Sequence, residues 1–210
     1  MNQSKPLFTK VVMSALTGAL SSFAVLGNGS ILALIARFKS LQTVPNVLIG
    51  NLAVVDLFNA VIYMPVQITY AVLEVSWYTG QSLAIATSFL NRLFAILNLG
   101  SMLALMANMY FAIGFDLKYF AWKTNKKAVV CACLVWFIST VLAVLSSIPQ
   151  FRVERGDAPV REYRQKFFKN GRYVFAAFLA FCIIVCAVLG FLTIWSIRKK
   201  KKKVFKFFHF

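Results

Sequence analysis

Acidic residues and the residue types used in catalysis are scarce in this 210-residue chain. It has only six Asp and Glu residues, one His and four Cys. The sequence contains no Ser-His-Asp set, no Cys-His pair, no HExxH sequence and no phosphate-binding loop, so we expect no enzyme. The four Cys and the single His209, close to the end of the chain, leave little scope for a metal site.

Charged residues are sparse as a whole, and most of them are basic. They make up 14% of the chain against 60% apolar residues, whereas soluble domains hold about 25% charged and 45–50% apolar residues. This composition excludes an ordinary soluble enzyme and a disordered chain. A net charge of +17 would suit a nucleic-acid binder. The basic residues lie between long apolar runs, however, which is typical of a membrane protein. We therefore expect membrane lipids as partners and no nucleic acid.

Five apolar runs are long enough to cross a bilayer, which takes roughly 20 residues. They cover residues 11–36, 45–73, 82–113, 128–148 and 173–197, followed by a basic tail at 198–210. Because lipid offers no partners for backbone N–H and C=O groups, these runs must be helices. The sequence therefore predicts a single all-α transmembrane domain over residues 1–210, whose first run is retained as an anchor.

The distribution of basic residues predicts how the chain is oriented. The tail after the fifth run holds the densest basic cluster, and cytoplasmic loops are enriched in Lys and Arg. With this end inside, 13 basic residues lie on the cytoplasmic side and nine outside. We therefore expect an extracellular N-terminus and a cytoplasmic C-terminus. The tail itself either lies on an anionic leaflet or only flanks the last span.

Polar residues inside the apolar runs mark candidate sites. Asp56 lies in the middle of the second run, where a carboxylate costs roughly 2.5–3.5 kcal/mol and is expected to face the bundle interior. Asn28 on the first run is its expected partner, and Asn98 lies on the third run. These amides either belong to a functional polar site or only join helices by hydrogen bonds.

Pro65 interrupts the second run. It removes one backbone hydrogen bond and predicts a kink, which opens space between the helices in their outer half. Tyr63, Phe89 and Phe94 either line that space or face lipid. Arg92 on the third run either snorkels outward or lines the same cavity.

The order of short motifs along the chain resembles the rhodopsin-like G-protein-coupled receptors. The matching segments are Gly27-Asn28 for the GN pair, 51–57 for NLAxxDL, 77–80 for WxxG, 108–113 for DRYxAI, 116–119 for PLKY, and Trp136 for the tryptophan of the fourth span. Each motif is short, but their order and spacing across the first four runs carry the resemblance.

The sequence also departs from that family. Asn108 and Met109 stand where the family has Asp and Arg. Asn91 stands where amine-binding members have Asp, and Ala84 stands where the usual outer Cys is found. Spans six and seven, with their CWxP and NPxxY motifs, do not follow the fifth run. The chain is therefore similar to a degenerate member truncated after the fifth span, with five of the seven helices of a receptor-type bundle.

The resemblance implies a plasma-membrane receptor that detects an extracellular ligand and signals to a heterotrimeric G protein. Receptor homo- or hetero-oligomers are a further expected partner. The implied site residues are Asn91, Arg92 and Phe94 beside the ligand, Asp56, Asn28 and Asn98 in a polar core able to hold a sodium ion, and Asn108, Met109 and Tyr110 facing the G protein.

Two alternatives to a signalling receptor stay open. One is a non-signalling truncated receptor that associates with full-length receptors, which the absence of the last two spans favours. The other is a small transporter or channel subunit with Asp56 as an ion site. Transporters usually show paired repeats and broken helices, and the sequence shows neither.

Overall fold

The computed structural model describes residues 7–73, 81–115, 119, 121, 123–153, 176–177 and 179–200. Across these residues the chain is helical and no strand occurs. Five helices are long and apolar enough to cross a membrane, namely Leu7–Arg37, Val44–Thr69, Ala86–Gly114, Asn125–Ser147 and Leu179–Lys200. The predicted all-α bundle of five membrane-length helices is therefore confirmed. The predicted fifth run, 173–197, begins outside the described residues.

The second span is built from three consecutive segments. The elements are α1 (Leu7–Arg37), the short 3-10 helix η1 (Lys39–Leu41), α2 (Val44–Phe58), the π-helix η2 (Asn59–Tyr63), α3 (Met64–Leu73), α4 (Gln81–Gly114) and α6 (Asn125–Val153). Thus α2, η2 and α3 follow one another without a break, and the other described spans are single helices.

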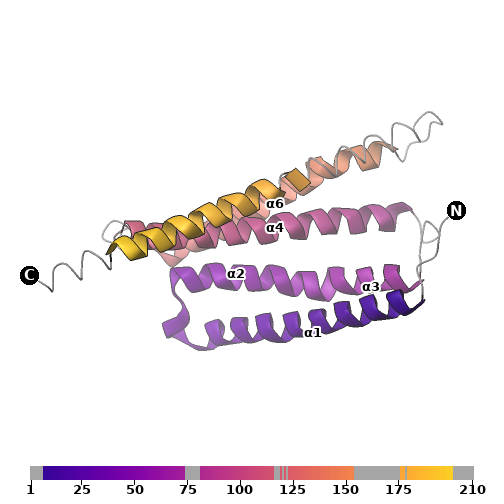
Figure 1. Cartoon of the computed structure of the whole chain (residues 1–210), viewed down its shortest axis with the longest axis horizontal. Helices are drawn as coiled ribbons and strands as arrows, with labels where there is room; N and C mark the ends of the chain where they lie inside the picture. Colours follow the sequence, from indigo (N-terminus) through magenta and orange to yellow (C-terminus); the bar gives the residue numbers. More distant parts are fainter. Residues whose placement is uncertain are drawn as a thin grey trace, which may run out of the picture.

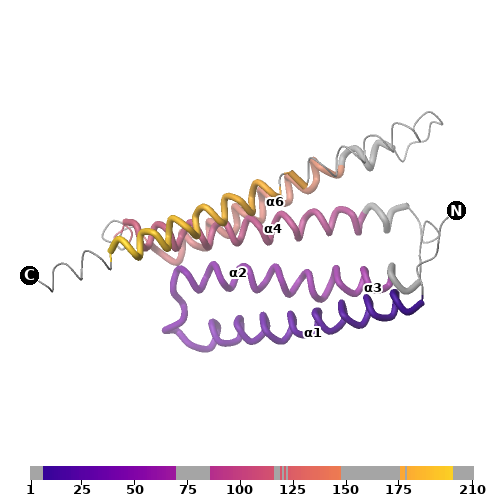
Figure 2. Tube along the Cα trace, viewed as in Figure 1, coloured from indigo at the N-terminus to yellow at the C-terminus, as the bar shows by residue number. Residues whose placement is uncertain are grey.

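Successive helices run antiparallel, with α2 packed between α1 and α4, and α4 packed against α6 (Figure 1, Figure 2). The helix Leu179–Lys200, yellow in Figure 1, overlies α4 and α6 in that view. Its buried residues, Cys182 and Cys186, are four apart and so lie on one face. Arg37 at the end of α1, Gly114 at the end of α4 and Asn125 at the start of α6 all lie at one end of the bundle. We call it the basic end.

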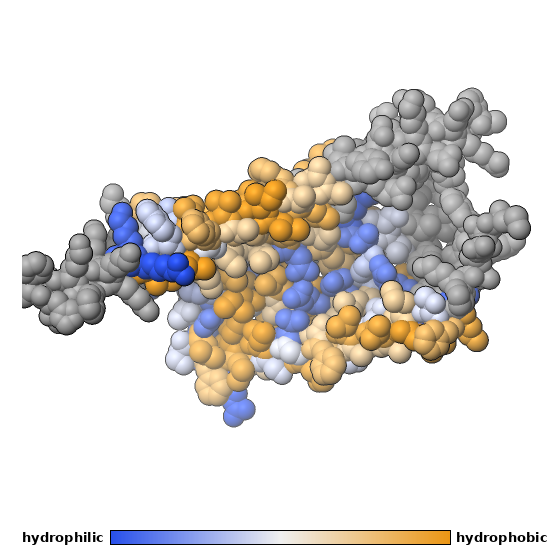
Figure 3. All heavy atoms as spheres, in the orientation of Figure 1, coloured by the Kyte–Doolittle hydropathy of each residue, from blue (hydrophilic) through white to orange (hydrophobic). Residues whose placement is uncertain are grey.

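The packed interior is small and the outer surface is apolar. Val44 and Leu48 of α2 pack with Ala128 of α6 near the basic end. A second cluster joins Val55 of α2 to Leu97 of α4 at mid-depth. Large apolar side chains instead cover the outer flanks (Figure 3). This distribution suits helices surrounded by lipid, where association depends on close packing and hydrogen bonds.

The span predicted to kink at Pro65 contains the π-helix η2, which ends at Tyr63, two residues before the proline. Pro65 has no N–H to donate to the preceding turn, and π-turns and prolines are common causes of bends in helices. The Ser21 hydroxyl of α1 donates to the backbone oxygen of Ala60 within η2, at 2.9 Å. The altered turn is thereby tied to α1.

Candidate functional site

The side chain of Asn51 joins three helices through two hydrogen bonds. Its Nδ2 donates to the Ser101 hydroxyl of α4 at 2.8 Å, and its Oδ1 accepts from the Trp136 indole Nε1 of α6 at 2.9 Å. Ser101 is only 1% exposed. Donor and acceptor ends of the amide are both satisfied, so this cluster holds the bundle together. We call Asn51, Ser101 and Trp136 the three-helix node.

A small residue lets α4 and α6 approach closely beside this node. A Cβ added to Gly100 would lie 3.0 Å from Val135 Cγ1 and 3.7 Å from Ser139 Oγ. On the other flank, the Phe58 ring meets the Trp136 ring edge-on, with centroids 6.2 Å apart. Small residues at helix contacts are typical of packing in membranes. We call this α2–α4–α6 contact the closed side of the bundle.

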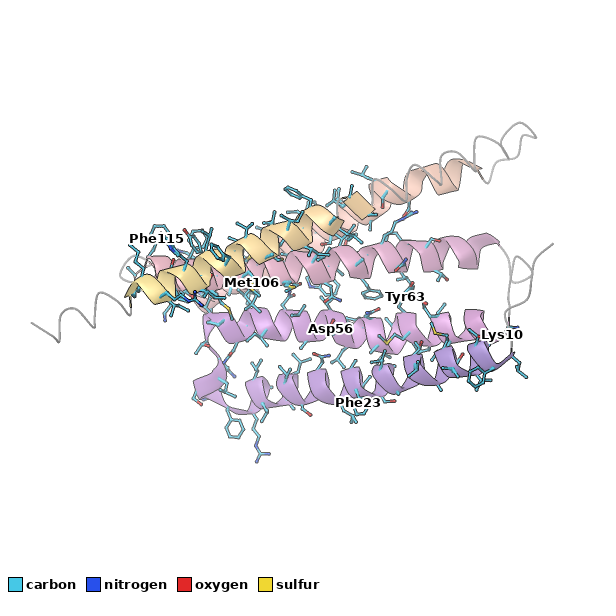
Figure 4. The ribbon with its side chains drawn as sticks, viewed as in Figure 1. Lys10, Phe23, Asp56, Tyr63, Met106 and Phe115 are labelled. Atoms are coloured by element: carbon cyan, nitrogen blue, oxygen red, sulfur yellow. The ribbon has the colours of Figure 1, made fainter. Side chains whose placement is uncertain are left out.

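Asp56, five residues after Asn51, projects from a different side of α2. At about 100° per residue, the two side chains point roughly 140° apart. Asp56 is half-buried, and no hydrogen bond or ion pair joins it to any residue that the structure describes. Figure 4 labels it near the middle of the second span, and Figure 3 shows hydrophilic side chains gathered over the middle of the bundle in the same view. We call the surface that contains Asp56 the polar face.

Asn28 and Asn98 lie on the two helices beside α2, Asn28 nearer to the basic end than Asp56 and Asn98 farther from it. At 1.5 Å per residue, Asn28, Asp56 and Asn98 lie roughly 14, 18 and 24 Å from the basic end. Both amides are half-buried. The structure shows no hydrogen bond between Asn28 and Asp56 among the described residues, and Asn28 Nδ2 donates to the backbone oxygen of Ala24 at 3.0 Å. A bond to the preceding turn is a common alternative for this side chain.

Two of the residues predicted beside a ligand lie in opposite environments. Asn91 is exposed, whereas Phe94 is 6% exposed and packs with Val55 and Leu97 in the mid-depth cluster. The Phe94 ring lies 6.3 Å from the Tyr63 ring, between centroids. Phe94 is therefore a core ring of the bundle, although Tyr63 beside it is half-buried and continues toward the surface.

Arg92, the third residue of that group, reaches across to α6. One guanidinium nitrogen donates to the backbone oxygen of Ser146 at 3.0 Å and lies 3.3 Å from the Ser147 hydroxyl. Ser147 is fully buried. Arg92 thus ties α4 to α6 above the three-helix node, and Asn91, Arg92 and Phe94 do not share one environment.

Comparison with known proteins identifies the family. A family profile described as "7 transmembrane receptor (rhodopsin family)" matches residues 27–206 of this chain. The chain belongs to this receptor family. The resemblance carried by the GN pair, the NLAVVDL segment and Trp136 is confirmed, and the chain is a multi-pass membrane protein of the rhodopsin family.

Individual receptors of this family are about 30% identical to the chain over the stretches that align. It is 31% identical over 135 residues to the 5-hydroxytryptamine receptor 1A-alpha of Takifugu rubripes, covering 64% of the chain and 32% of that receptor. It is 29% identical over 139 residues to prokineticin receptor 2 of Rattus norvegicus, covering 66% and 36%. The chain thus spans about a third of the length of these curated relatives.

The rhodopsin-family motif at the basic end of α4 has an unusual chemistry here. The Tyr119 hydroxyl donates to Asn108 Oδ1 at 2.9 Å, and Asn108 Nδ2 is buried without a hydrogen-bond partner among the described residues. Met109 is 37% exposed. The Tyr110 ring packs against Phe111, with centroids 5.9 Å apart. The chain therefore presents the Met109 thioether at the position where the family resemblance predicts a guanidinium.

Sequence reasoning missed Ser101 and the Ser146-Ser147 pair as partners of Asn51 and Arg92. The available signal was local: Ser101 follows Gly100 in an apolar stretch, and such small-residue pairs are typical of helix contacts in membranes. Other predicted segments lie outside the described residues, namely 77–80, 116–118 and the tail from 201 to 210. Nothing is described of the Ala84 side chain either.

Proposed function

We propose that this chain acts in the plasma membrane as a receptor that detects an extracellular ligand and signals to a heterotrimeric G protein. Membership of the rhodopsin family supports the proposal. The main structural observation behind it is the state of Asp56 on the polar face. Asp56 is half-buried at mid-depth with no hydrogen bond or ion pair among the described residues. An ionisable residue within a membrane is costly, so one that no neighbouring side chain pairs is a reasonable starting hypothesis for a functional site.

The proposed signalling mechanism is a shift between two arrangements of the bundle. A ligand moves such an equilibrium only by binding one arrangement better than the other. Two hydrogen bonds at the three-helix node link α2 to α4 and to α6, so the node gives these helices a fixed relation to one another. Asp56 has no such partner in the part of the chain described here. It is therefore the group whose surroundings differ most readily between the two arrangements.

In this proposal Asp56, Asn28 and Asn98 form a polar core that holds a sodium ion. The residue types fit a hard cation, because carboxylate and amide oxygens are the ligands that such ions prefer. Asn28 donates through its Nδ2 to its own helix, which leaves its Oδ1 as an acceptor. A bound ion would supply the positive charge that offsets the Asp56 carboxylate, so it would favour the arrangement in which it is bound.

The proposed ligand side contains Asn91, Arg92 and Phe94. Asn91 is exposed and supplies a neutral amide, so it lacks the charge that would pair with a cationic amine. The chain is therefore not proposed to bind 5-hydroxytryptamine, although one relative is named for it. Arg92, held by α6, would fix the wall of the ligand site. Phe94 would support that wall from the core.

The proposed G-protein side is the basic end, with Asn108, Met109 and Tyr110. Described basic residues gather at this end, and basic segments favour the cytoplasmic side. The N-terminus would then be extracellular and the C-terminus cytoplasmic. Receptor homo- or hetero-oligomers are proposed as further partners.

The test is G-protein activation in cells that express the full chain at their surface. Dissociation of a G-protein heterotrimer is followed by resonance energy transfer, with and without candidate extracellular ligands, for the unaltered chain and for Asp56→Asn. The proposal predicts a signal above that of untransfected cells, altered by the substitution at matched surface expression. An Asn51→Asp variant, altered at the node, serves as the control for general damage to the bundle.

Absence of any signal, while a full-length relative responds in the same cells, would contradict the proposal. If co-expression of the chain also lowers the surface level of that relative, the non-signalling partner role replaces it. If the chain instead conducts sodium into liposomes and Asp56→Asn abolishes that flux, the transporter or channel role replaces the receptor role.

A further inference from the structure

Half of the methionines in this chain lie in one short stretch of α4. The sequence has six Met residues, and Met102, Met106 and Met109 fall within the same eight positions. Residues three and four apart project from the same side of a helix, so these three side chains leave α4 within roughly 60° of one another. They are spread over roughly 10 Å along the helix axis. We call these three residues the methionine face.

The methionine face is more open than the packed side of α4. Met102 is 40% exposed and Met109 37%, and Met106 is half-buried. Ser101 and Leu97, on the packed side, are buried. Methionines often fill irregular gaps in a core, but that role does not account for side chains as exposed as these. Figure 4 labels Met106 in the half of the bundle nearer the basic end.

The methionine face continues from a polar part of α4. Asn98 is half-buried, lies four residues before Met102 and projects from the same side of the helix. Counted from the ends of their helices, Met102 and Asp56 both lie roughly 18 Å from the basic end. Asp56, on the neighbouring helix α2, is the only acid among the described residues. A cation at this depth would therefore have a negative charge at its own level, which offsets part of the cost of placing it within a membrane.

We propose that the methionine face binds a copper(I) ion. Thioether sulfur is a soft, uncharged ligand, and ligands of this kind select copper(I) over hard cations such as sodium or magnesium. Met106 lies one turn from each of the other two, so neighbouring thioethers can approach one ion from either side. The site differs in its ligand atoms from the oxygen ligands proposed for sodium, and the inference is independent of whether the chain signals.

The test is a calorimetric titration of the purified full chain in detergent with silver(I), a redox-stable ion that also prefers sulfur. The four cysteines, Cys131, Cys133, Cys182 and Cys186, are first replaced by Ala, because thiols bind the same ions. The buffer is a nitrate buffer at pH 5, where the imidazole of His209 is protonated but a thioether has no proton to lose. We expect one silver ion per chain, and the same stoichiometry with copper(I) kept reduced by ascorbate.

The decisive variant is M102L/M106L/M109L, which keeps apolar side chains of similar volume and is expected to lose the bound ion. M106L alone is expected to weaken binding more than M102L or M109L, because Met106 is the middle ligand. The matched control is M13L/M64L, which removes one thioether from α1 and one from α3 and is expected to keep the ion.

Absence of silver binding to the Cys-free chain overturns the proposal, as does equal binding by the triple variant or an equal loss in the control. Displacement of silver by excess magnesium also overturns it, because it would assign the ion to oxygen ligands. If the Cys-free chain does not fold, the unaltered chain decides, and the triple substitution must lower the number of bound silver ions by one. If the triple variant does not fold, the single variants decide, and unchanged affinity in all three overturns the proposal.

Discussion

Asn51 and Asp56 lie five residues apart on the same helix at membrane depth, yet their surroundings are opposite. Asn51 has both ends of its amide hydrogen-bonded, to α4 and to α6. Asp56 is half-buried on the polar face and has no hydrogen bond or ion pair with a described residue. The comparison teaches that a polar residue in a membrane helix is not by itself evidence of function. Its role depends on whether the neighbouring helices already satisfy it.

The same contrast separates two sides of the bundle. The closed side has close backbone approach at Gly100 and a buried hydroxyl at Ser101. Substitutions there should lower stability. Substitutions on the polar face should leave stability nearly unchanged and alter the response to ions or ligands. Four substitutions test this difference, and they are given in order of decreasing expected loss of stability.

Gly100→Leu is expected to lower stability most. The added side chain would meet Val135, whose Cγ1 already lies 3.0 Å from the position of a Cβ, and overpacking of this kind costs about 1–3 kcal/mol. Thermal unfolding of the purified chain in detergent measures it. Gly27→Leu is the control, because nothing lies within 4 Å of a Cβ there. A similar loss in both variants would show that α4 and α6 are not closely packed at Gly100.

Asn51→Leu is expected to cost about 1–2 kcal/mol, because Ser101 and the Trp136 indole would both lose their partner. A double-mutant cycle with Trp136→Phe isolates the bond to the indole, with an expected coupling of about 0.6–1.7 kcal/mol. A coupling of zero would show that the bond between Asn51 and Trp136 does not stabilise the bundle.

Ser21→Ala tests the tie between α1 and the π-helix. The lost bond to the backbone oxygen of Ala60 should cost about 0.6 kcal/mol. Ser22→Ala is a matched neighbour, because the Ser22 hydroxyl bonds to Gly18 in its own helix. We expect it to leave the unfolding temperature unchanged. Equal effects of the two would mean that Ser21 does not stabilise the irregular turn.

Asp56→Asn is expected to change stability least, by no more than about 0.5 kcal/mol, because it breaks no described hydrogen bond. It should abolish any difference in unfolding temperature between sodium chloride and choline chloride, if the unaltered chain binds sodium as proposed. A destabilisation as large as that of Asn51→Leu would place Asp56 on the closed side.

The helices were predictable from the sequence, whereas most contacts between them were not. Length and apolarity alone fix the five membrane helices, since lipid leaves the backbone no other conformation. Pro65 predicted a kink, but nothing in the sequence predicted the π-helix before it or its bond to Ser21. Asn51 was recognisable as part of a motif, but its bond to Ser101 depends on how α2 and α4 are rotated.

Asn28 shows why such pairings are hard to predict from sequence. A mid-membrane amide near an acid suggested a partner across helices. The competing bond to Ala24 is local and requires no tertiary arrangement. Arg92 is the opposite case, because its contacts are distant in the chain. Its partners Ser146 and Ser147 lie more than 50 residues away, so the sequence near Arg92 gave no sign of them.

The most direct test compares the reactivity of thiols placed on the two sides. Cys131, Cys133, Cys182 and Cys186 are first replaced by Ala, and Asp56→Cys and Ser101→Cys are then made separately. Membranes holding each variant are treated with a small hydrophilic methanethiosulfonate, and labelling is followed by mass spectrometry. We expect the thiol at position 56 to be labelled within minutes and the thiol at position 101 to be protected until the chain unfolds. Equal labelling at both positions, or labelling at position 101 alone, would contradict it.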